Sequence, residues 1–198
     1  MSALSHFSNE DIIAVPDSPY FLTPFHPSDK QALVNALNDP LILEYTTRIS
    51  SPYTLEDAEN FISQTCKLPN RHLRAIRTSD GEYVGTISIE QLTPERAKEV
   101  EAEEGAWEVG YLLAKEWRGK QVLTPVVRLM VEEFAFKREG LKAICGFASV
   151  GNWASRRIME KVGFEFLGEI GHLITKPNQP GRGIRVWKFI KRRADAPQ

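Results

Sequence analysis

Two segments in the second half of the chain carry residue types whose spacing could do chemistry. The first, at 115–124, is centred on Trp117-Arg118-Gly119-Lys120. It lies between an expected strand and an expected helix, so its backbone N–H groups and the helix N-terminus would converge on one point, where both favour a phosphate anion. Arg118 and Lys120 add positive charge at that point. The alternative interpretation of this run is an ordinary solvated turn.

The second segment, at 152–164, has the signals of a well-bounded helix. Asn152 is a favourable N-cap, and Gly163 can adopt the left-handed conformation that ends a helix before a strand. Three apolar residues between them recur at helical spacing and would form the buried face: Ala154, Ile158 and Val162. By itself this pattern predicts only a helix.

The composition limits the expected partners. The chain has 198 residues, which is the size of one globular domain. Its 25 basic and 26 acidic residues leave a formal charge of −1, so the charge balance does not indicate binding to nucleic acid or to an anionic membrane. We therefore expect a small or local partner, and a chain that is a monomer or a homodimer.

Neither the cysteines nor the histidines indicate a metal site. Cys66 and Cys145 are far apart and match no CxxC or other metal-ligand spacing, as expected of reduced thiols in a cytosolic protein. The histidines are isolated, and none has the HExxH spacing of a zinc enzyme: His6, His26, His72 and His172. Residues 1–19 lack the basic and apolar regions of a secretory signal, and no apolar run is long enough to span a bilayer. A cytoplasmic protein is expected.

The first half of the chain predicts two helices followed by a hairpin. In order, the predicted elements are strand 20–25, helix 28–37, helix 55–67, strand 72–77 and strand 83–91. Ser28 would cap the first helix, and Thr54 would cap the second with Asp57 as its capping-box acid. The turn at 79–81 predicts that the two later strands pair antiparallel. The glutamate-rich segment 93–105 is either a short solvated helix or a mobile insertion, and we favour the helix.

The second half alternates strands with helices. Its predicted elements are strand 106–113, helix 124–139, strand 143–150, helix 152–162, strand 164–174 and strand 183–190. Such alternation implies a parallel pair with a helical crossover. No linker or repeat divides the chain, so we predict one α+β domain with a mixed sheet over 20–190. A leader at 1–19 would precede it, and a disordered basic tail at 191–198 would follow.

Together, the two chemical segments resemble the GCN5-related N-acetyltransferase (GNAT) superfamily, and most closely its RimJ/RimL-like branch. In that family the later helix reads Asn-x-x-Ser-x-x-x-x-x-Lys-x-Gly-Phe. This chain matches every specified position of that pattern with Asn152, Ser155, Lys161, Gly163 and Phe164. The loop departs from the family pattern, because Gln121 and Leu123 stand where glycine, and glycine or alanine, are usual. The resemblance spans most of the chain and includes Pro24, Asp29 and the run Glu108-Val109-Gly110-Tyr111.

The resemblance implies a single GNAT-like α+β domain with helices on both faces of its sheet. That sheet would be mixed, mostly antiparallel and splayed between two parallel strands. Acetyl-CoA would lie in the wedge as co-substrate, with its pantetheine arm along strand 106–113 and its pyrophosphate over the loop. The implied cofactor-binding residues are Leu112, Leu113, Arg118, Gly119, Lys120, Gln121, Val122, Leu123, Thr124 and Asn152.

The activity that the resemblance implies is transfer of an acetyl group to a primary amine by direct attack on the thioester. Glu108 is the candidate general base, the alternative being a strand carboxylate that faces solvent or pairs with an arginine. Ser155 and Tyr111 are candidates to protonate the leaving thiolate, because Met159 occupies the position of the tyrosine that many relatives use. The alternative for each is a structural role: Ser155 would be a polar residue in the first turn of a helix, and Tyr111 would be an aromatic residue that packs on a strand.

The acceptor remains open between a small-molecule amine and a protein N-terminus. In this family the substrate pocket is built from the segment between the first two helices and from the late hairpin. Here these regions supply Tyr45, Thr46, Arg48, Tyr53 and the loop 172–185. The alternative function is a degenerate acyl-CoA-binding protein without transferase activity, which Gln121, Leu123 and the missing tyrosine favour.

Overall fold

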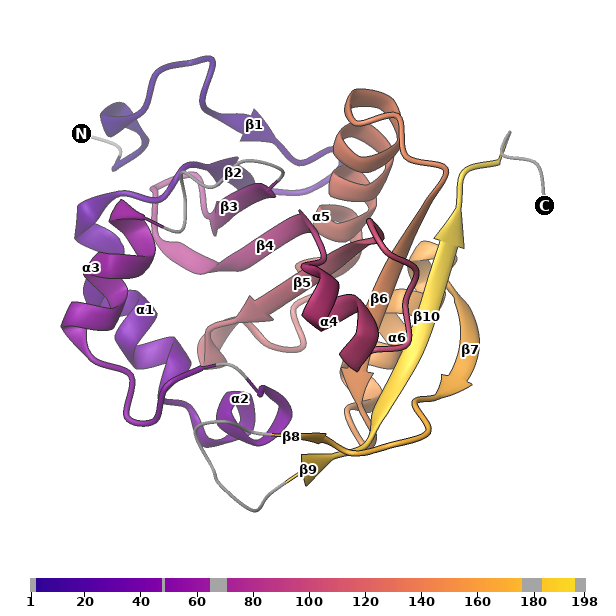
Figure 1. Ribbon diagram of the computed structural model, residues 1–198. Coiled ribbons are helices and arrows are strands. Elements are labelled where there is room, and N and C mark those ends of the chain that lie inside the picture. Colours follow the sequence, from indigo (N-terminus) through magenta and orange to yellow (C-terminus); the bar gives the residue numbers. More distant parts are fainter. Residues whose placement is uncertain (1–2, 48, 65–70, 176–182, 195–198) are drawn as a thin grey trace.

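A mixed sheet forms the centre of the molecule. The computed structural model describes residues 3–47, 49–64, 71–175 and 183–194. In spatial order, the eight strands of the sheet are β1 (Ile13–Ala14), β2 (Phe21–Thr23), β3 (Arg71–Arg77), β4 (Tyr83–Gln91), β5 (Trp107–Leu113), β6 (Ala143–Ser149), β10 (Val186–Arg192) and β7 (Glu165–Glu169) (Figure 1). Neighbouring strands of this sheet pair antiparallel except for β5 and β6, which are parallel. A second sheet consists of β8 (Ile174–Thr175) and β9 (Gly183–Ile184).

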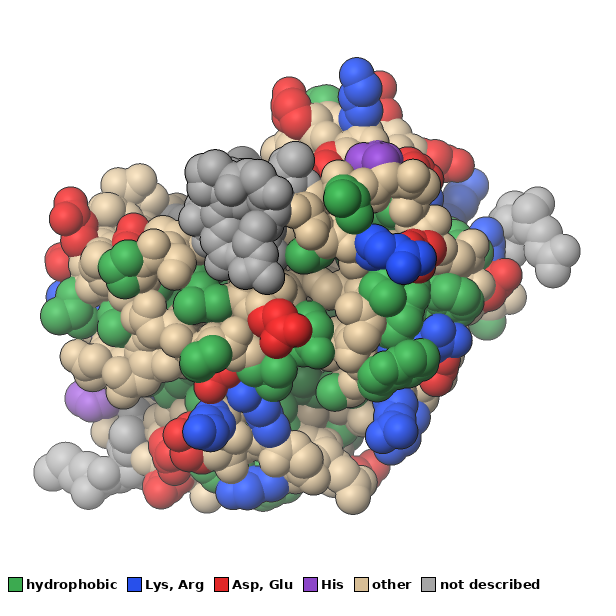
Figure 2. All heavy atoms as spheres, turned by 90° about the horizontal axis from the view of Figure 1, so that it is seen from below, with side chains coloured by type: hydrophobic (Ala, Val, Ile, Leu, Met, Phe, Trp, Pro, Cys, Tyr) green, Lys and Arg blue, Asp and Glu red, His purple; other side chains and the backbone are tan. Residues whose placement is uncertain are grey.

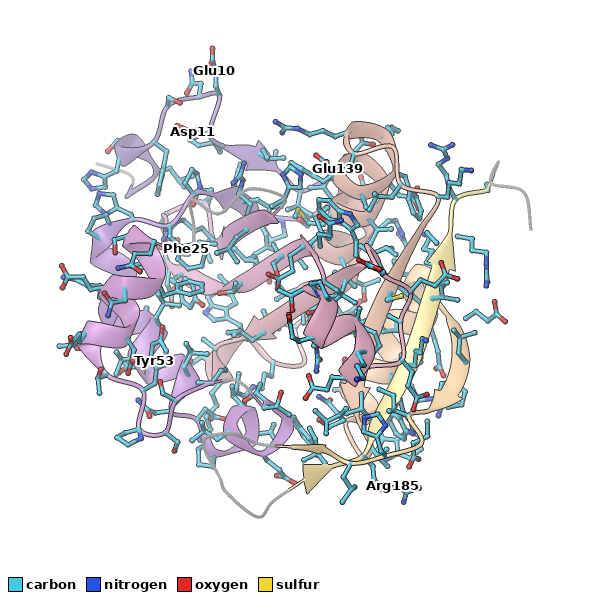
Figure 3. The ribbon with its side chains drawn as sticks, viewed as in Figure 1. Glu10, Asp11, Phe25, Tyr53, Glu139 and Arg185 are labelled. Atoms are coloured by element: carbon cyan, nitrogen blue, oxygen red, sulfur yellow. The ribbon has the colours of Figure 1, made fainter. Side chains whose placement is uncertain are left out.

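Helices cover both faces of the sheet, as the sequence predicts. The helices are α1 (Lys30–Leu37), α2 (Pro40–Tyr45), α3 (Leu55–Ser63), α4 (Pro94–Glu99), α5 (Leu123–Leu129), a π-helix (Met130–Arg138) and α6 (Trp153–Val162). Short 3-10 turns lie at Ala3–His6, Pro27–Asp29 and Lys115–Trp117. In Figure 3, Phe25 and Tyr53 lie beside α1 and α3, whereas Glu139 lies at the end of the π-helix on the other side of the molecule.

The alternation of residues along β4 separates the two layers. Ile87 and Ile89 are fully buried in the core shared with α5, the π-helix and α6. Thr86, Ser88 and Glu90 alternate with them and therefore face the α1–α3 side, where a second buried cluster forms around Leu33 and Ala58 among others. A polar strip thus lies beneath α1, α2 and α3. From the sequence, this alternation was interpreted only as the sign of a strand.

The sheet splays between β5 and β6, as predicted. These two strands pair only at Glu108 with Cys145 and at Val109 with Gly146, although β5 continues to Leu113. Beyond Val109 the β6-facing edge of β5 has no strand beside it among the described residues. Met159 of α6 packs against β6, since a Cβ on Gly146 would lie 2.6 Å from its Cε atom.

Several local signals are confirmed. Thr54 and Asp57 form a reciprocal capping box at the start of α3. Asn152 caps α6 by accepting a hydrogen bond from the Ser155 N–H at 3.1 Å, and Gly163 ends α6 with a φ of 89°. The segment at 93–105 contains α4, which is the helix that the sequence favoured over a mobile insertion.

The first half contains one helix that the sequence missed. The run at 38–40 was predicted to end a helix, and it also begins α2, because the Asp39 carboxylate accepts hydrogen bonds from the Leu41 and Ile42 N–H groups. Pro40 stands at the first helical position, where its missing N–H costs nothing. At 28–37 the expected cap also differs: His26 rather than Ser28 caps the turn that leads into α1, with Asp29 as its capping-box acid.

The second half differs from expectation in its element boundaries. The helix predicted at 124–139 is α5 followed by a π-helix, in which the consecutive residues Phe134, Ala135 and Phe136 are all buried, an arrangement that α-helical spacing does not place on one face. The strand predicted at 164–174 is divided into β7 and β8. The last strand reaches Arg192, because residues 191–192 extend the ladder with β6, so the predicted tail begins later than Lys191. Residues 195–198 lie outside the described part.

Candidate active site

A cavity of about 680 Å³ lies where β5 and β6 part. It extends from the loop after β5 and the N-terminus of α6 to the space beneath α1, α2 and α3. Cavities of this volume commonly hold organic ligands. Of the sequence-predicted site residues, the structure places these on its lining: Glu108, Tyr111, Leu112, Leu113, Arg118, Gly119, Leu123, Asn152 and Ser155.

The remaining loop residues do not line the cavity. Lys120 places its Nζ 4.5 Å from the centre of the Trp117 ring, and Val122 is buried in the main core. Gln121 is exposed and has a φ of 59°, in the left-handed region that the usual glycine would adopt without strain. Thr124 is half-buried in the first turn of α5. These residues can meet a phosphate only through their backbone or after their side chains move.

Arg118 already has a partner at the start of α2. One of its terminal nitrogens lies 3.0 Å from the Asp39 Oδ1 atom and 3.5 Å from the Leu113 carbonyl oxygen. Burial disfavours the Asp39 carboxylate, but Arg118 and the α2 N–H groups outweigh this and hold the Asp39 pKa below its ordinary value of 3.8. The predicted phosphate-binding guanidinium therefore also ties the loop to α2.

Tyr111 and Ser155, which the sequence considered separately, lie together. The Tyr111 hydroxyl is 2.9 Å from the Ser155 hydroxyl and also donates to the Ser155 carbonyl oxygen at 3.3 Å. Burial raises the Tyr111 pKa to about 12, although the hydrogen bond with Ser155 acts in the opposite direction. Tyr111 is therefore protonated at neutral pH.

Glu108 lies on the lining of the cavity beside an arginine. The closest atoms of Glu108 and Arg96 are 3.9 Å apart, and Arg96 also donates to Glu99 at 2.8 Å. The Nε atom of Arg96 is buried and has no hydrogen-bond partner among the described residues. The arginine pairing that was the alternative interpretation of Glu108 is thus present, and it does not remove the carboxylate from the cavity lining.

Several polar residues of the cavity were not recognised from the sequence, including three on β4 and one on α4. Thr86, Ser88 and Glu90 belong to β4, and Arg96 belongs to α4. Glu90 is the direct cross-strand partner of Glu108. Polar residues at every second position of an otherwise apolar strand are the signal that could have identified Thr86, Ser88 and Glu90. Arg96 stands in a glutamate-rich segment, and no local pattern marks it.

The predicted acceptor side is partly described. Tyr45, Thr46 and Tyr53 line the cavity. Tyr45 also joins α2 to the far side of the wedge, because its carbonyl oxygen accepts a hydrogen bond from Ser149 at 2.8 Å. Arg48 and residues 176–182 lie outside the described part of the chain.

The described residues include one buried thiol and no cluster of metal-ligand side chains. Cys145 is buried beside Glu108 in the sheet, and burial raises its thiol pKa, which makes it a poor nucleophile. Cys66 is not among the described residues. Within the described ranges, no group of three or more histidine, cysteine, aspartate or glutamate side chains could hold a metal ion. None of the helices in the same ranges is long and apolar enough to cross a membrane.

The sheet parts between two parallel strands, and a basic loop and a helix N-terminus lie beside the opening. This is the acyltransferase architecture that the sequence suggested. The chain matches the family model described as "Acetyltransferase (GNAT) domain" over residues 20–165. The chain therefore belongs to the GNAT acetyltransferase family. The resemblance inferred from the Asn152–Phe164 motif is confirmed.

The relatives include proteins of the RimJ/RimL kind. The chain is 34% identical over 85 residues to the putative ribosomal N-acetyltransferase YdaF of Bacillus subtilis (strain 168), and this match spans 43% of the chain and 42% of that relative, less than half of either. A ribosomal-protein-S5-alanine acetyltransferase structure from Vibrio fischeri shares the fold at a TM-score of 0.72, with 19% identity over 94% of this chain and 99% of that one. The structure of RimL, a ribosomal L7/L12 alpha-N-protein acetyltransferase, in complex with coenzyme A has a TM-score of 0.72, with 16% identity over 91% and 97% of the two chains.

Proposed function

We propose that this protein transfers the acetyl group of acetyl-CoA to a primary amine, by direct attack of the amine on the thioester. The observation that carries the proposal is the cavity at the parting of β5 and β6, which joins the basic loop to a chamber containing Glu108. Acetyl-CoA, when bound, supplies the activated carbonyl group. The names of the relatives favour a protein N-terminus as acceptor, and a small-molecule amine is the other candidate.

The free edge of β5 fits a pantetheine arm. The Ala114 N–H donates to the Val84 carbonyl oxygen of β4, and alternate residues of a strand bond to the same neighbour. The N–H groups of Tyr111 and Leu113 are therefore directed toward the opening, whereas that of Leu112 is directed toward β4. In agreement, the Leu113 carbonyl oxygen faces Arg118. Leu113 is thus better placed than Leu112 to donate a backbone hydrogen bond to the thioester oxygen.

Glu108 is the group assigned to remove the proton of the incoming ammonium. An alkyl amine with a pKa of about 10 is mostly protonated at pH 7, and freeing its lone pair costs roughly 4 kcal/mol at 1.36 kcal/mol per pKa unit. A carboxylate in the same chamber can accept that proton directly or through water. The position of Glu108 on the lining of the cavity supports this role.

The Tyr111–Ser155 pair is assigned the role of stabilising the sulfur atom of the leaving thiolate. With a pKa of about 12, Tyr111 would transfer its proton uphill to a thiolate with a pKa of about 8.5, at a cost of roughly 5 kcal/mol. A hydrogen bond to the developing thiolate avoids that cost. The pair therefore acts mainly as a hydrogen-bond donor, and the thiolate takes its proton from solvent after release.

A calorimetric titration with acetyl-CoA, followed by thiol release across a panel of amines, tests the proposal. Binding together with amine-dependent thiol release is the expected result. Binding without thiol release for any amine would favour the second candidate, an acyl-CoA-binding protein without transferase activity. The observation that favours this second candidate is Met159, which is buried and stands where many relatives have the tyrosine that protonates the thiolate. Absence of binding would contradict both.

A further inference from the structure

The short helix α2 is attached to both sides of the opening between β5 and β6. At its start, Asp39 pairs with Arg118, which belongs to the loop that follows β5, at 3.0 Å. At its end, the Tyr45 carbonyl oxygen accepts a hydrogen bond at 2.8 Å from Ser149, the last residue of β6. Three of the six residues of α2 also line the cavity. The helix therefore spans the opening and forms part of the wall on the proposed acceptor side.

One side of α2 faces solvent. In Figure 1, α2 lies at the lower edge of the molecule. The face seen from below carries both acidic and basic side chains among hydrophobic ones (Figure 2). Within α2, Pro40 and Glu44 are exposed, whereas Ile42 is buried. Because the helix is short and packs on one side only, the contacts at its two ends contribute to holding it across the opening.

Asp39 lies next to the cavity lining but is not part of it. Arg118 lines the cavity, whereas Asp39 does not, and the Asp39 side chain is only 11% exposed. Three donors meet on a single oxygen of Asp39: its Oδ1 atom accepts from the Leu41 N–H at 3.0 Å, from the Ile42 N–H at 3.4 Å and from Arg118 at 3.0 Å. The helix cap and the ion pair thus share one atom, which fixes Arg118 relative to the first turn of α2.

The guanidinium group of Arg118 uses only one of its nitrogens in these contacts. Its Nη2 atom binds Asp39 and also lies 3.5 Å from the Leu113 carbonyl oxygen, a distance at which a hydrogen bond is weak. The Nε and Nη1 atoms make no hydrogen bond with the described residues, so their N–H groups remain for a ligand. The other basic residues of the loop, Lys115 and Lys120, are exposed and do not line the cavity. Asp39 is therefore the main contact that orients the one basic side chain of this loop on the lining.

We propose that Asp39 is a positioning residue for the cofactor: it holds the Arg118 guanidinium group so that Nε and Nη1 remain available to the pyrophosphate of acetyl-CoA. This inference rests on the proposed function and adds a residue of α2 to it. A planar guanidinium group that is oriented beforehand loses less side-chain freedom when it binds phosphate oxygens. Because the same Asp39 oxygen caps α2, a cofactor held by Arg118 also fixes the start of the helix that lines the proposed acceptor side. Acetyl-CoA and the acceptor therefore bind with positive coupling.

Calorimetric titration with acetyl-CoA tests the role of Asp39. Asp39→Ala is expected to raise the Kd about threefold to tenfold, because Arg118 must then be ordered on binding. Asp39→Asn keeps an oxygen that can accept from Arg118 and from the α2 N–H groups, so it should raise the Kd by less. Asp57→Ala is the matched control, since Asp57 takes part in the cap of α3 and lies outside the cavity lining; it should leave the Kd unchanged. An unchanged Kd for Asp39→Ala would overturn the inference, and so would a lower one, because Asp39 would then compete with the phosphate.

A double-substitution cycle tests whether Asp39 acts through Arg118. In the Arg118→Ala protein, the additional substitution Asp39→Ala should leave the Kd for acetyl-CoA unchanged, although the same substitution raises it when Arg118 is present. This non-additivity is the signature of a residue that acts through another. Equal effects of Asp39→Ala in the two backgrounds would show that Asp39 acts independently of Arg118, and would overturn the inference.

Thiol release with the best acceptor amine tests the coupling of the two sites. At saturating acetyl-CoA, Asp39→Ala and Arg118→Ala should each raise the acceptor KM severalfold, with a smaller change in kcat, because either substitution frees the start of α2. An unchanged acceptor KM in both variants would contradict the coupling. Absence of thiol release with every amine would contradict the proposed function, whereas an acetyl-CoA Kd that Asp39→Ala does not raise, in an active enzyme, would contradict this inference alone.

Discussion

At the scale of residues, Glu108 is accessible from the cavity and has charged neighbours. It lies on the cavity lining, where an acceptor can approach, and its neighbours Glu90 and Arg96 carry opposite charges. The closest atoms of Glu108 and Arg96 are 3.9 Å apart, and the proposed base role requires the carboxylate to accept a proton beside this arginine.

Replacement of Glu108 tests whether it accepts that proton. We expect Glu108→Gln to lower kcat/KM by about 10²–10⁴-fold at pH 7. The loss should shrink as the pH approaches the pKa of the amine, because the free base then needs no proton acceptor. A pH–rate profile of both proteins is the measurement, and a profile that is lowered equally at every pH would exclude Glu108 as the base.

Removal of a single hydroxyl tests the Tyr111–Ser155 pair. Tyr111→Phe keeps the ring that packs against the main core and removes the donor. The expected result is a loss of roughly 10- to 100-fold in kcat, which is the magnitude of one hydrogen bond to a charged atom, with an unchanged KM for acetyl-CoA. If KM rose while kcat stayed the same, Tyr111 would have a role in binding and not at the sulfur.

The Asp39 carboxylate links stability to pH. Its pKa is lowered in the folded protein, so its contribution is present above the unfolded value of 3.8 and is lost as the pH falls through the folded value. Asp39→Asn should therefore reduce the free energy of unfolding by about 0.5–1 kcal/mol at pH 7 and by much less near pH 2. Urea unfolding at the two pH values measures this. Glu10→Gln, on the exposed N-terminal segment, is the control.

At the scale of elements, the loop between β5 and α5 contains a strained residue at a position where glycine would be unstrained. Gln121 adopts a φ of 59°, a conformation that costs a residue with a Cβ atom roughly 1 kcal/mol. Helix α5 begins two residues later, so the strained residue determines how the loop enters the helix.

This strain predicts a stabilising substitution. Gln121→Gly should raise the free energy of unfolding by up to about 1 kcal/mol and strengthen acetyl-CoA binding, because it frees the backbone beside the proposed pyrophosphate position. Gln121→Ala keeps the Cβ atom and should not reproduce either effect. Thermal unfolding and calorimetric titration of the three proteins decide the matter. A stabilisation by alanine equal to that by glycine would show that the glutamine side chain, and not the backbone, is the cause.

At the scale of the whole molecule, the cavity joins the two layers that cover the sheet. One part of its lining comes from β5, its loop and α6, where we propose that the cofactor binds, and the other part comes from α1, α2 and α3, where we propose that the acceptor binds. Arg118 and Asp39 connect the two sides at 3.0 Å, and the Ser149 hydroxyl connects β6 to the end of α2. A ligand that spans the wedge should therefore stabilise the protein as one unit.

Acetyl-CoA is expected to raise the thermal stability of the whole protein. At 100 times its dissociation constant, a ligand adds about 2.7 kcal/mol to the free energy of unfolding. Arg118→Ala should reduce the rise in Tm that acetyl-CoA produces, measured against the same variant without ligand. Lys120→Ala should reduce it less, because Lys120 lies over Trp117 and outside the cavity lining. An undiminished rise for Arg118→Ala would remove Arg118 from the phosphate site.

The sequence alone determined the features that depend on near neighbours. Residues within a few positions of one another set the capping box of α3, the ends of α6 and the period-two strands, and the family motif is itself a helix with its two caps. The parallel pair followed from the order of strands and helices. The π-helix was missed because the burial of Phe134–Phe136 depends on packing. In contrast, α2 has a local start signal in Asp39 and Pro40, and it was missed because this run was interpreted only as the end of a helix.

Only the tertiary structure decided which side chains meet in the site. Tyr111 and Ser155 are 44 residues apart, and Arg118 and Asp39 are 79 apart. Their contacts depend on the register of β4 against β5, on where β5 and β6 part, and on how α2 crosses the opening. The same register makes Glu90 the partner of Glu108. No local pattern specifies such contacts, since each arises from the packing of elements that are distant in the chain.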